Sequence, residues 1–301
     1  MSAQAQAPRM AQAAPAGPYR RRLRLRAPDW IVATSASTLL LIVVLGFVLP
    51  VITGYGVDEF VARPLLPPSS AHPFGTDTFG RDVMVRTFAA SHVDYLVAIL
   101  GVGTAALLGT AVGVFVASTR IRGLDWLTMR LTDGVIAFPF TVLALAFVVV
   151  IGSNATVLGL PPGMPALLAA YVIVGWAYYA RIARSQTLSL RTRDFVTAGR
   201  QLGYSDTRIA IRHISPIVLA TTMAYAVGDA IITVALTASL SFLGAGIAPP
   251  TPEWGQMMYE GRGLIETAWW LTAFPSLALV VSGLCLAIIG DRLIRRLEDR
   301  P

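Results

Sequence analysis

The sequence predicts an all-α, polytopic membrane protein with six transmembrane helices and with both termini in the cytoplasm. The 301 residues are 55% hydrophobic and 14% charged, whereas about a quarter of the residues of a soluble domain are charged. The apolar residues form long runs without charge, and about 20 helical residues are enough to cross a hydrocarbon core. The basic residues are concentrated in alternate loops between these runs, which predicts the orientation.

The six predicted spans follow from the charge-free runs. Residues 134–180 hold 47 positions without a charge, enough for two crossings, with breaks at residues 152–154 and 161–165. The run from residue 213 to residue 252 contains one charge, Asp229. The expected cores of the spans are residues 31–51, 95–117, 134–152, 165–182, 216–243 and 267–290.

These spans divide the chain into segments with different expected environments. The first apolar run is longer than a typical signal-peptide core and no small-residue cleavage site follows it, so we expect a retained helix. The expected segments are a disordered, basic cytoplasmic N-terminus (1–30), a first transmembrane helix (31–53), an extracytoplasmic segment (54–94), a five-helix core (95–291) with a cytoplasmic loop (184–215), and a cytoplasmic tail (292–301).

The basic residues predict a multi-pass protein of the plasma (inner) membrane. The chain contains no lysine, so arginine supplies all 24 basic side chains. With a cytoplasmic N-terminus, 20 of the 24 arginines fall on the cytoplasmic side, in agreement with the positive-inside rule. The outer side keeps Arg63, Arg81, Arg86 and Arg262. This asymmetry accounts for the formal charge of +7, and we expect no binding of nucleic acid.

Composition also argues against a catalytic centre in this chain. A phosphate-binding P-loop requires a lysine, which the chain lacks. The three histidines lie far apart in sequence, and the single cysteine, Cys285, excludes an intrachain disulfide. No nucleophile elbow and no suitably spaced pair of carboxylates is visible. We therefore expect no enzyme, no metal and no cofactor.

The arginine-rich loop before the fifth span has a pattern of its own. Residues 194–201 predict two helical turns, and Gly203 permits the positive φ of a sharp break. Ser205 or Asp206 can cap a second short helix. Pro216 falls near the start of the fifth span, where a missing N–H is tolerated. The pattern predicts a helix–glycine turn–helix that projects from the bilayer; the alternative is a solvated loop whose arginines only fix the topology.

This loop resembles the cytoplasmic loop of ABC-importer permease subunits. Their motif is Glu-Ala-Ala, three residues, Gly, nine residues, and Ile-x-Leu-Pro. Here Thr197-Ala198-Gly199 is followed by Gly203 and Pro216 at the same offsets, with Thr197 in place of the acidic residue. Residues 72–82, 133–139 and 239–255 are similar to the dipeptide/oligopeptide/nickel branch of that family, and specifically to its C-type permease subunit.

The resemblance implies a transmembrane permease subunit of an ATP-driven importer for di- or oligopeptides, which forms the translocation path in the lipid bilayer. It implies a homologous second permease, two ATPase subunits that hold ATP and Mg, and an extracytoplasmic substrate-binding protein. The implied ATPase-docking residues are Asp194, Thr197, Ala198, Gly199, Arg200, Gly203, Asp206, Arg208 and Pro216. The alternatives are a nickel-chelate importer permease of the same family and a secondary transporter or channel without an ATPase partner.

Three further groups of residues carry expectations. Asp229 lies near mid-membrane, where a carboxylate costs about 2.5–3.5 kcal/mol, so we expect it in the translocation path; the alternatives are a buried pair and a protonated carboxyl. Small residues four positions apart in the second span predict close helix packing; they are Gly101, Ala105, Gly109 and Gly113. Outside the membrane, Asp77 or Asp82 would pair with Arg81 or Arg86, and Trp254 would anchor at the membrane interface or contact the receptor. The extracytoplasmic structural or receptor-contact residues are Gly75, Asp77, Gly80, Arg81, Asp82 and Trp254.

Overall fold

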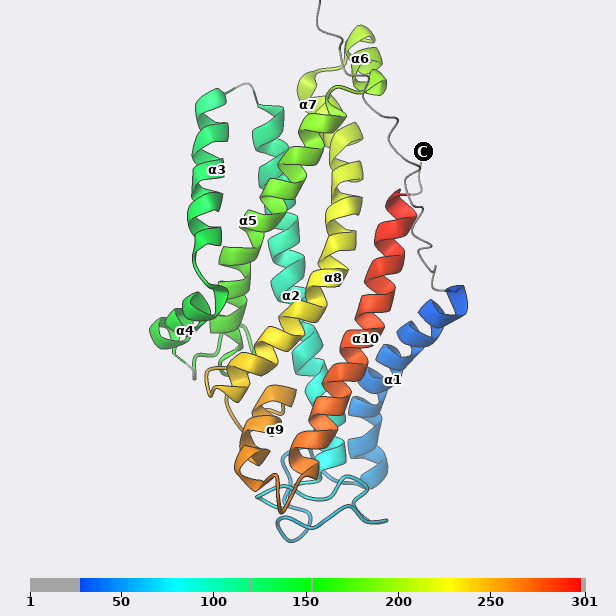
Figure 1. Cartoon of the computed structure of the whole chain (residues 1–301), viewed down its shortest axis with the longest axis vertical. Helices are drawn as coiled ribbons and strands as arrows, with labels where there is room; N and C mark the ends of the chain where they lie inside the picture. Colours follow the sequence, from blue (N-terminus) through cyan, green and yellow to red (C-terminus); the bar gives the residue numbers. More distant parts are fainter. Residues whose placement is uncertain (1–27, 120, 153, 299–301) are drawn as a thin grey trace, which may run out of the picture.

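The structure is a computed structural model that describes residues 28–298 except 120 and 153, and the side chains of residues 122 and 298 are not described. The expected cytoplasmic N-terminus, residues 1–30, lies outside the described residues but for its last three positions. The described part is a helical bundle (Figure 1). Its helices are α1 (Asp29–Thr53), α2 (Val83–Ser118), α3 (Arg122–Ala137), α4 (Phe140–Ile151), α5 (Met164–Leu190), α6 (Asp194–Gln201), α7 (Asp206–Ile209), a π-helical turn (Ala210–Ile214), α8 (Ser215–Phe242), α9 (Trp254–Gly261), a 3-10 turn (Arg262–Leu264) and α10 (Trp270–Glu298).

The prediction of an all-α, polytopic membrane protein is confirmed. Within the described residues, five helices are long and apolar enough to span a membrane, and α3 with α4 gives a sixth if the pair is counted as one span. The expected third span, residues 134–152, is not one continuous helix, because α3 and α4 meet within it at 87°. Pro139 lacks an N–H and forces the preceding residue out of the helical region, and Phe138 has the extended angles φ −80° and ψ 132°.

Three helix ends lie away from their expected positions. Helix α2 begins at Val83 rather than near residue 95, because the Asp82 carboxylate accepts the Val85 N–H at 2.9 Å and caps the helix. The last part of the expected extracytoplasmic segment, residues 83–94, is therefore helical. Helix α5 continues to Leu190, which shortens the expected loop at 184–215, and α10 continues to Glu298 through most of the expected tail at 292–301.

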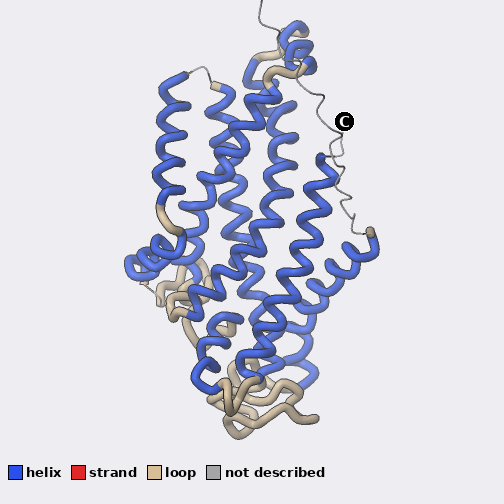
Figure 2. Tube along the Cα trace, viewed as in Figure 1, coloured by secondary structure: helices blue, strands red, loops and turns tan. Residues whose placement is uncertain are grey.

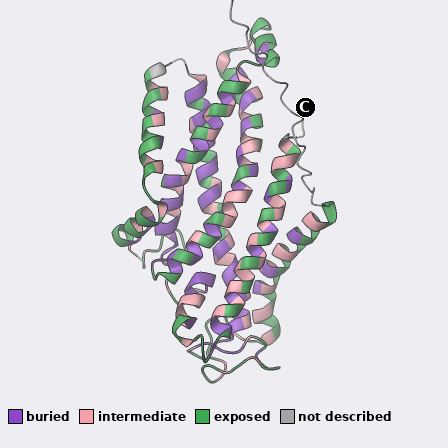
Figure 3. Ribbon diagram, viewed as in Figure 1, coloured by how far each residue is buried: buried purple, intermediate pink, exposed green. Residues whose placement is uncertain are grey.

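Helices α2 and α5 approach each other along the predicted stripe of small residues. A Cβ added to Gly109 would meet the Trp176 carbonyl oxygen closer than 3.0 Å, and one added to Gly113 would meet the Ala180 carbonyl oxygen as closely. Figure 3 shows that buried residues are concentrated along both helices. The expectation of close packing along this stripe is confirmed, and the absence of side chains is what allows backbone contact.

The two ends of the bundle differ in construction. Helices α6 and α7 project beyond one end, whereas the segment between α1 and α2 lies with α9 at the opposite end (Figure 1). Figure 2 shows that most of the irregular chain is collected at this second end and beside α4. The predicted cytoplasmic loop and the predicted extracytoplasmic segment are thus separated by the length of the bundle.

The glycine contact between α2 and α5 gives a first prediction. Gly109→Ala should destabilise the helical bundle by about 1–3 kcal/mol, because the new methyl group overlaps a backbone oxygen that cannot move without separating the helices. Gly103→Ala on the same helix is the matched control, since a Cβ there meets nothing within 4 Å. Thermal unfolding in detergent measures both, and equal unfolding temperatures for the two variants would contradict the prediction.

Candidate functional site

The segment that joins α5 to α8 has the predicted helix–glycine turn–helix form. Helix α6 is followed by Gly203, whose φ of +80° is the left-handed conformation that favours glycine. The Ser205 hydroxyl accepts the Arg208 N–H at 3.2 Å and caps α7, as predicted. Helix α7 then continues through the π-helical turn Ala210–Ile214 directly into α8, a continuity that the sequence pattern did not predict.

Apolar contacts fix this segment to the end of the bundle. Val196 on α6 and Ile209 on α7 are 0% and 3% exposed and pack in one cluster with Val114 of α2 and Ala183 of α5. The segment is therefore an ordered part of the fold rather than a solvated loop. A movement imposed on α6 and α7 would act directly on the ends of α2, α5 and α8.

The outward face of this segment carries most of the predicted docking residues. The exposed ones are Asp194, Thr197, Ala198, Arg200, Gly203, Arg208 and Pro216, whereas Gly199 is buried and Asp206 is half-buried. Arg200 pairs with Asp206 across the turn at 3.1 Å. Leu202 and Ile211 are also exposed, at 72% and 68%, and sequence reasoning missed them. The sequence feature that could have identified them is an apolar residue on each side of a charged turn.

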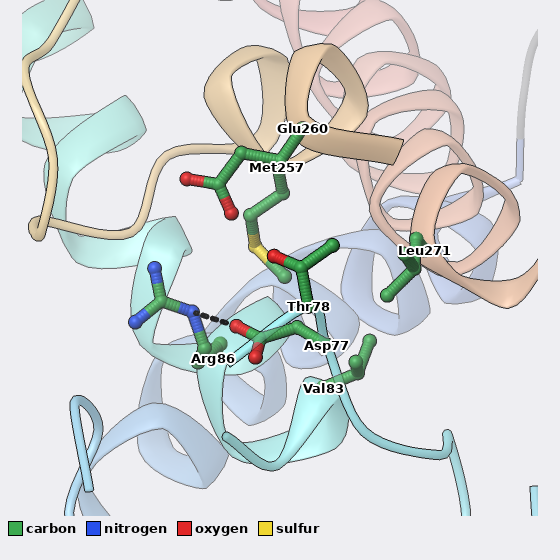
Figure 4. Close-up of a pocket in the computed structure, with 7 residues that line it drawn as sticks. All are labelled: Asp77, Thr78, Val83, Arg86, Met257, Glu260 and Leu271. Atoms are coloured by element: carbon green, nitrogen blue, oxygen red, sulfur yellow. Dashed lines mark ion pairs between the residues drawn. The ribbon is translucent and has the colours of Figure 1, made fainter. Parts of the chain in front are cut away.

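At the opposite end, a buried ionic cluster joins α2 to distant segments. The Arg81 Nε contacts the Asp77 carboxylate at 2.5 Å, and an Arg81 Nη contacts Glu260 of α9 at 3.1 Å. Arg86 contacts Asp58 at 2.6 Å and Asp77 at 3.7 Å. Figure 4 shows Asp77 directed at Arg86 beside a cavity of about 10 Å³, roughly the size that holds one water. The expectation that Asp77 pairs with the neighbouring arginines is confirmed.

The rest of this end is held by backbone conformation and by a histidine. Gly75 and Gly80 have φ of +74° and +81°, and a Cβ on either would collide with a carbonyl oxygen. Asp82 caps α2 and contacts His72 Nδ1 at 2.8 Å, so its partner is this histidine rather than an arginine. These residues act within the chain to position the start of α2.

Trp254 lies in the interior, which overturns its expected role as an interfacial anchor or receptor contact. The residue is 0% exposed, and its indole N–H donates to the Thr87 carbonyl at 2.8 Å. Glu253 caps α9 by accepting the N–H groups of Gly255 and Gln256, which turns Trp254 back against α2. The other extracytoplasmic candidates are buried as well, so their side chains contact the rest of this chain rather than its surroundings.

Asp229 lines a cleft between helices and does not lie in a closely packed helix interface. The cleft has a volume of about 390 Å³ and is lined by α2, α5, α8 and the bend between α3 and α4. Asp229 is half-buried near the middle of α8, and its Oδ2 accepts the Tyr179 hydroxyl of α5 at 2.6 Å. This hydrogen bond links two helices, and the open side of the carboxylate can face a ligand.

Comparison with known proteins identifies the family. Residues 109–300 match the family described as binding-protein-dependent transport system inner membrane component. The chain belongs to this family. It is a multi-pass permease of the inner membrane, in agreement with the apolar helices and with the resemblance stated above.

Several curated relatives cover most of the permease. A putative peptide transport system permease protein of Brucella suis is 38% identical, over 87% of this chain and 86% of the relative. The dipeptide transport system permease protein DppC of Alkalihalophilus pseudofirmus is 32% identical over 86% and 84%. The glutathione transport system permease protein GsiD of Escherichia coli is 32% identical over 89% and 86%.

A solved structure supports the fold. The methionine ABC transporter MetNI in an inward-facing conformation matches with a TM-score of 0.53 and 18% identity, over 71% of this chain and 97% of that one. At 18% identity, this comparison supports a similar arrangement of helices and nothing more.

The ionic cluster gives a second prediction. Arg86→Gln should destabilise the permease by about 1–3 kcal/mol, because it removes a buried cation and leaves Asp77 with Arg81 as its remaining charged partner. Arg63→Gln is the control, since Arg63 is an exposed arginine of the same end of the bundle and should change stability by no more than about 0.5 kcal/mol. Resistance to proteolysis in membrane vesicles measures the difference, and equal resistance of the two variants would argue against the structural role of the cluster.

Proposed function

We propose that this permease is a membrane subunit of an ATP-driven importer for di- or oligopeptides. The named relatives, which include peptide, dipeptide and glutathione permeases, support this substrate class. In this proposal a homologous second permease completes the translocation path, two ATPase subunits bind ATP and Mg, and an extracytoplasmic binding protein delivers the ligand. The distribution of arginines supports a cytoplasmic location for both termini and for α6 and α7.

The projecting segment α6–Gly203–α7 is the observation that carries the proposal. Its inner face is packed in the bundle, while its outer face presents Leu202, Ile211 and arginines that the described residues leave exposed. Exposed apolar side chains together with arginines are typical of the surfaces that proteins use to bind partners. We infer that an ATPase subunit binds this face and that movement of the ATPases displaces α6 and α7.

The transport cycle then follows from a shift between two conformations. A ligand can shift such an equilibrium only through unequal affinity for the two states. ATP would supply this bias through the ATPases, and the permease would pass it on through α7, the π-helical turn and α8. The spans would alternate between an inward-open and an outward-open arrangement around the cleft beside Asp229.

A nickel-chelate importer of the same family is the second candidate for the substrate, and a secondary transporter or channel is the alternative without ATPase. Purification of the permease in mild detergent distinguishes the secondary transporter and the channel from the proposed importer. Copurification of ATPase subunits supports the importer, whereas ATP-independent uptake by the permease alone would overturn it. Calorimetric titration of the associated binding protein with dipeptides and with nickel chelates distinguishes the substrates.

The turn at Gly203 gives a third prediction. Gly203→Val should uncouple uptake from ATP hydrolysis, because a β-branched residue at this φ costs about 1–2 kcal/mol, or roughly 5- to 30-fold in the population of the native turn. Gly159→Val is the matched control, since Gly159 has a similar φ of +76° and open surroundings but lies in the loop between α4 and α5. The measurement is the ratio of peptide uptake to ATP hydrolysis in proteoliposomes, and a normal ratio for Gly203→Val would remove the turn from the coupling mechanism.

Accessibility of the projecting segment gives a fourth prediction. In a Cys285→Ala background, Arg200→Cys should crosslink to an ATPase subunit, because Arg200 is exposed on α6. Phe60→Cys, at a position 70% exposed at the other end of the bundle, is the control and should not reach an ATPase. Mass spectrometry of crosslinks in membrane vesicles identifies the partners, and crosslinking of Arg200→Cys to the binding protein would reverse the proposed orientation.

A further inference from the structure

The cleft beside Asp229 combines one charged group with apolar and aromatic walls. Among the described residues that line it, Asp229 is the only charged one, and the remaining polar side chains are tyrosine and threonine hydroxyls. The Tyr171 hydroxyl already contacts Thr233 and Thr237 at 3.0 and 2.9 Å. The carboxylate therefore sets the electrostatic character of this cleft.

Asp229 lacks the cationic partner that the carboxylates of α3 have. Asp125 and Asp133 on α3 pair with Arg184 and Arg181 of α5. For Asp229, no arginine of the described chain lies within 4.0 Å, and its hydrogen bond comes from the neutral Tyr179 hydroxyl. Placing a carboxylate in the middle of a span costs free energy unless a cation or water compensates for its charge. The cleft therefore favours a positively charged ligand.

We propose that Asp229, oriented by Tyr179, binds the ammonium group of the transported ligand during its passage. This inference rests on the proposed function and names the ligand chemistry at one site of the path: a primary amine, which for a peptide is the N-terminal ammonium. The cleft volume of about 390 Å³ falls within the range of small-ligand sites, roughly 300–1,000 Å³.

The aromatic walls of the cleft fit the same chemistry. Tyr178 lines the cleft with 48% of its surface exposed, and Phe140 stacks on Tyr171 with ring centroids 4.8 Å apart. Aromatic faces attract ammonium groups and also accept apolar side chains. The walls therefore contact varied side chains while the carboxylate selects for the amine, an arrangement suited to ligands that share one charged group.

The first test measures the charge of the cleft without transport. In the assembled complex, with Cys285→Ala, Tyr178→Cys should react with a cationic methanethiosulfonate about tenfold faster than with an anionic one of similar size, relative to a free thiol. Adding Asp229→Asn should bring the two rates close together, and adding Asp229→Glu should preserve the preference. A preference that is unchanged by Asp229→Asn would overturn the proposal.

The second test measures transport with saturated binding protein. Asp229→Asn is nearly isosteric and should lower the turnover of free-amine dipeptides about tenfold, the size expected for one lost charge-assisted hydrogen bond, while Asp229→Glu should restore part of it. Unchanged turnover of Asp229→Asn would reject the inference. If the unmodified complex transports no peptide, the proposed function fails instead, and the thiol reaction rates still decide whether Asp229 attracts cations.

Discussion

Close contact between α2 and α5 is the constraint on which the rest of the helix arrangement depends. Gly109 and Gly113 bring α2 against backbone oxygens of α5, and no larger residue would fit there. This pair then positions both functional regions. The end of α5 leads into the projecting segment, whose Val196 packs against the same pair, and the middle of α5 supplies Tyr179 to Asp229. Separation of the two helices would disturb both regions together.

The two ends of the bundle are stabilised by different interactions, and this difference suits different tasks. At the α9 end, Arg81 and Arg86 are buried among carboxylates, and a buried ion tolerates little displacement because its partners must stay within reach. At the opposite end, Val196 and Ile209 hold the segment by apolar contacts, which tolerate small shifts, and most of the charged groups face outward. One end is fixed by internal ion pairs, and the other presents most of its charged groups at the surface.

The sequence predicted those features that local chemistry determines. The turn at Gly203 was predictable because a positive φ requires a special residue and a capping hydroxyl follows it. The bend at Pro139 was missed because a charge-free run shows hydropathy but not direction. The early start of α2 was missed because a charged residue such as Arg86 is typical of a loop outside the membrane. In the structure Arg86 is buried, and it donates to the Asp58 carboxylate and to the Pro250 carbonyl. The prediction of Trp254 at the membrane interface failed for a related reason. The sequence around Trp254 does not reveal that its indole N–H donates to the distant Thr87 carbonyl.

Continuity between α7 and α8 determines where a movement of the projecting segment can be absorbed. No loop separates them, because the π-helical turn Ala210–Ile214 connects the two helices directly. Displacement of α7 therefore passes into α8, whose far end is held where Gly255 meets the Ala238 backbone. Between these ends, α8 is joined to α5 across the cleft by side-chain hydrogen bonds such as that from Tyr179 to Asp229. Hydrogen bonds of this kind contribute only about 0.5–3 kcal/mol each, so breaking one of them to widen the cleft costs little.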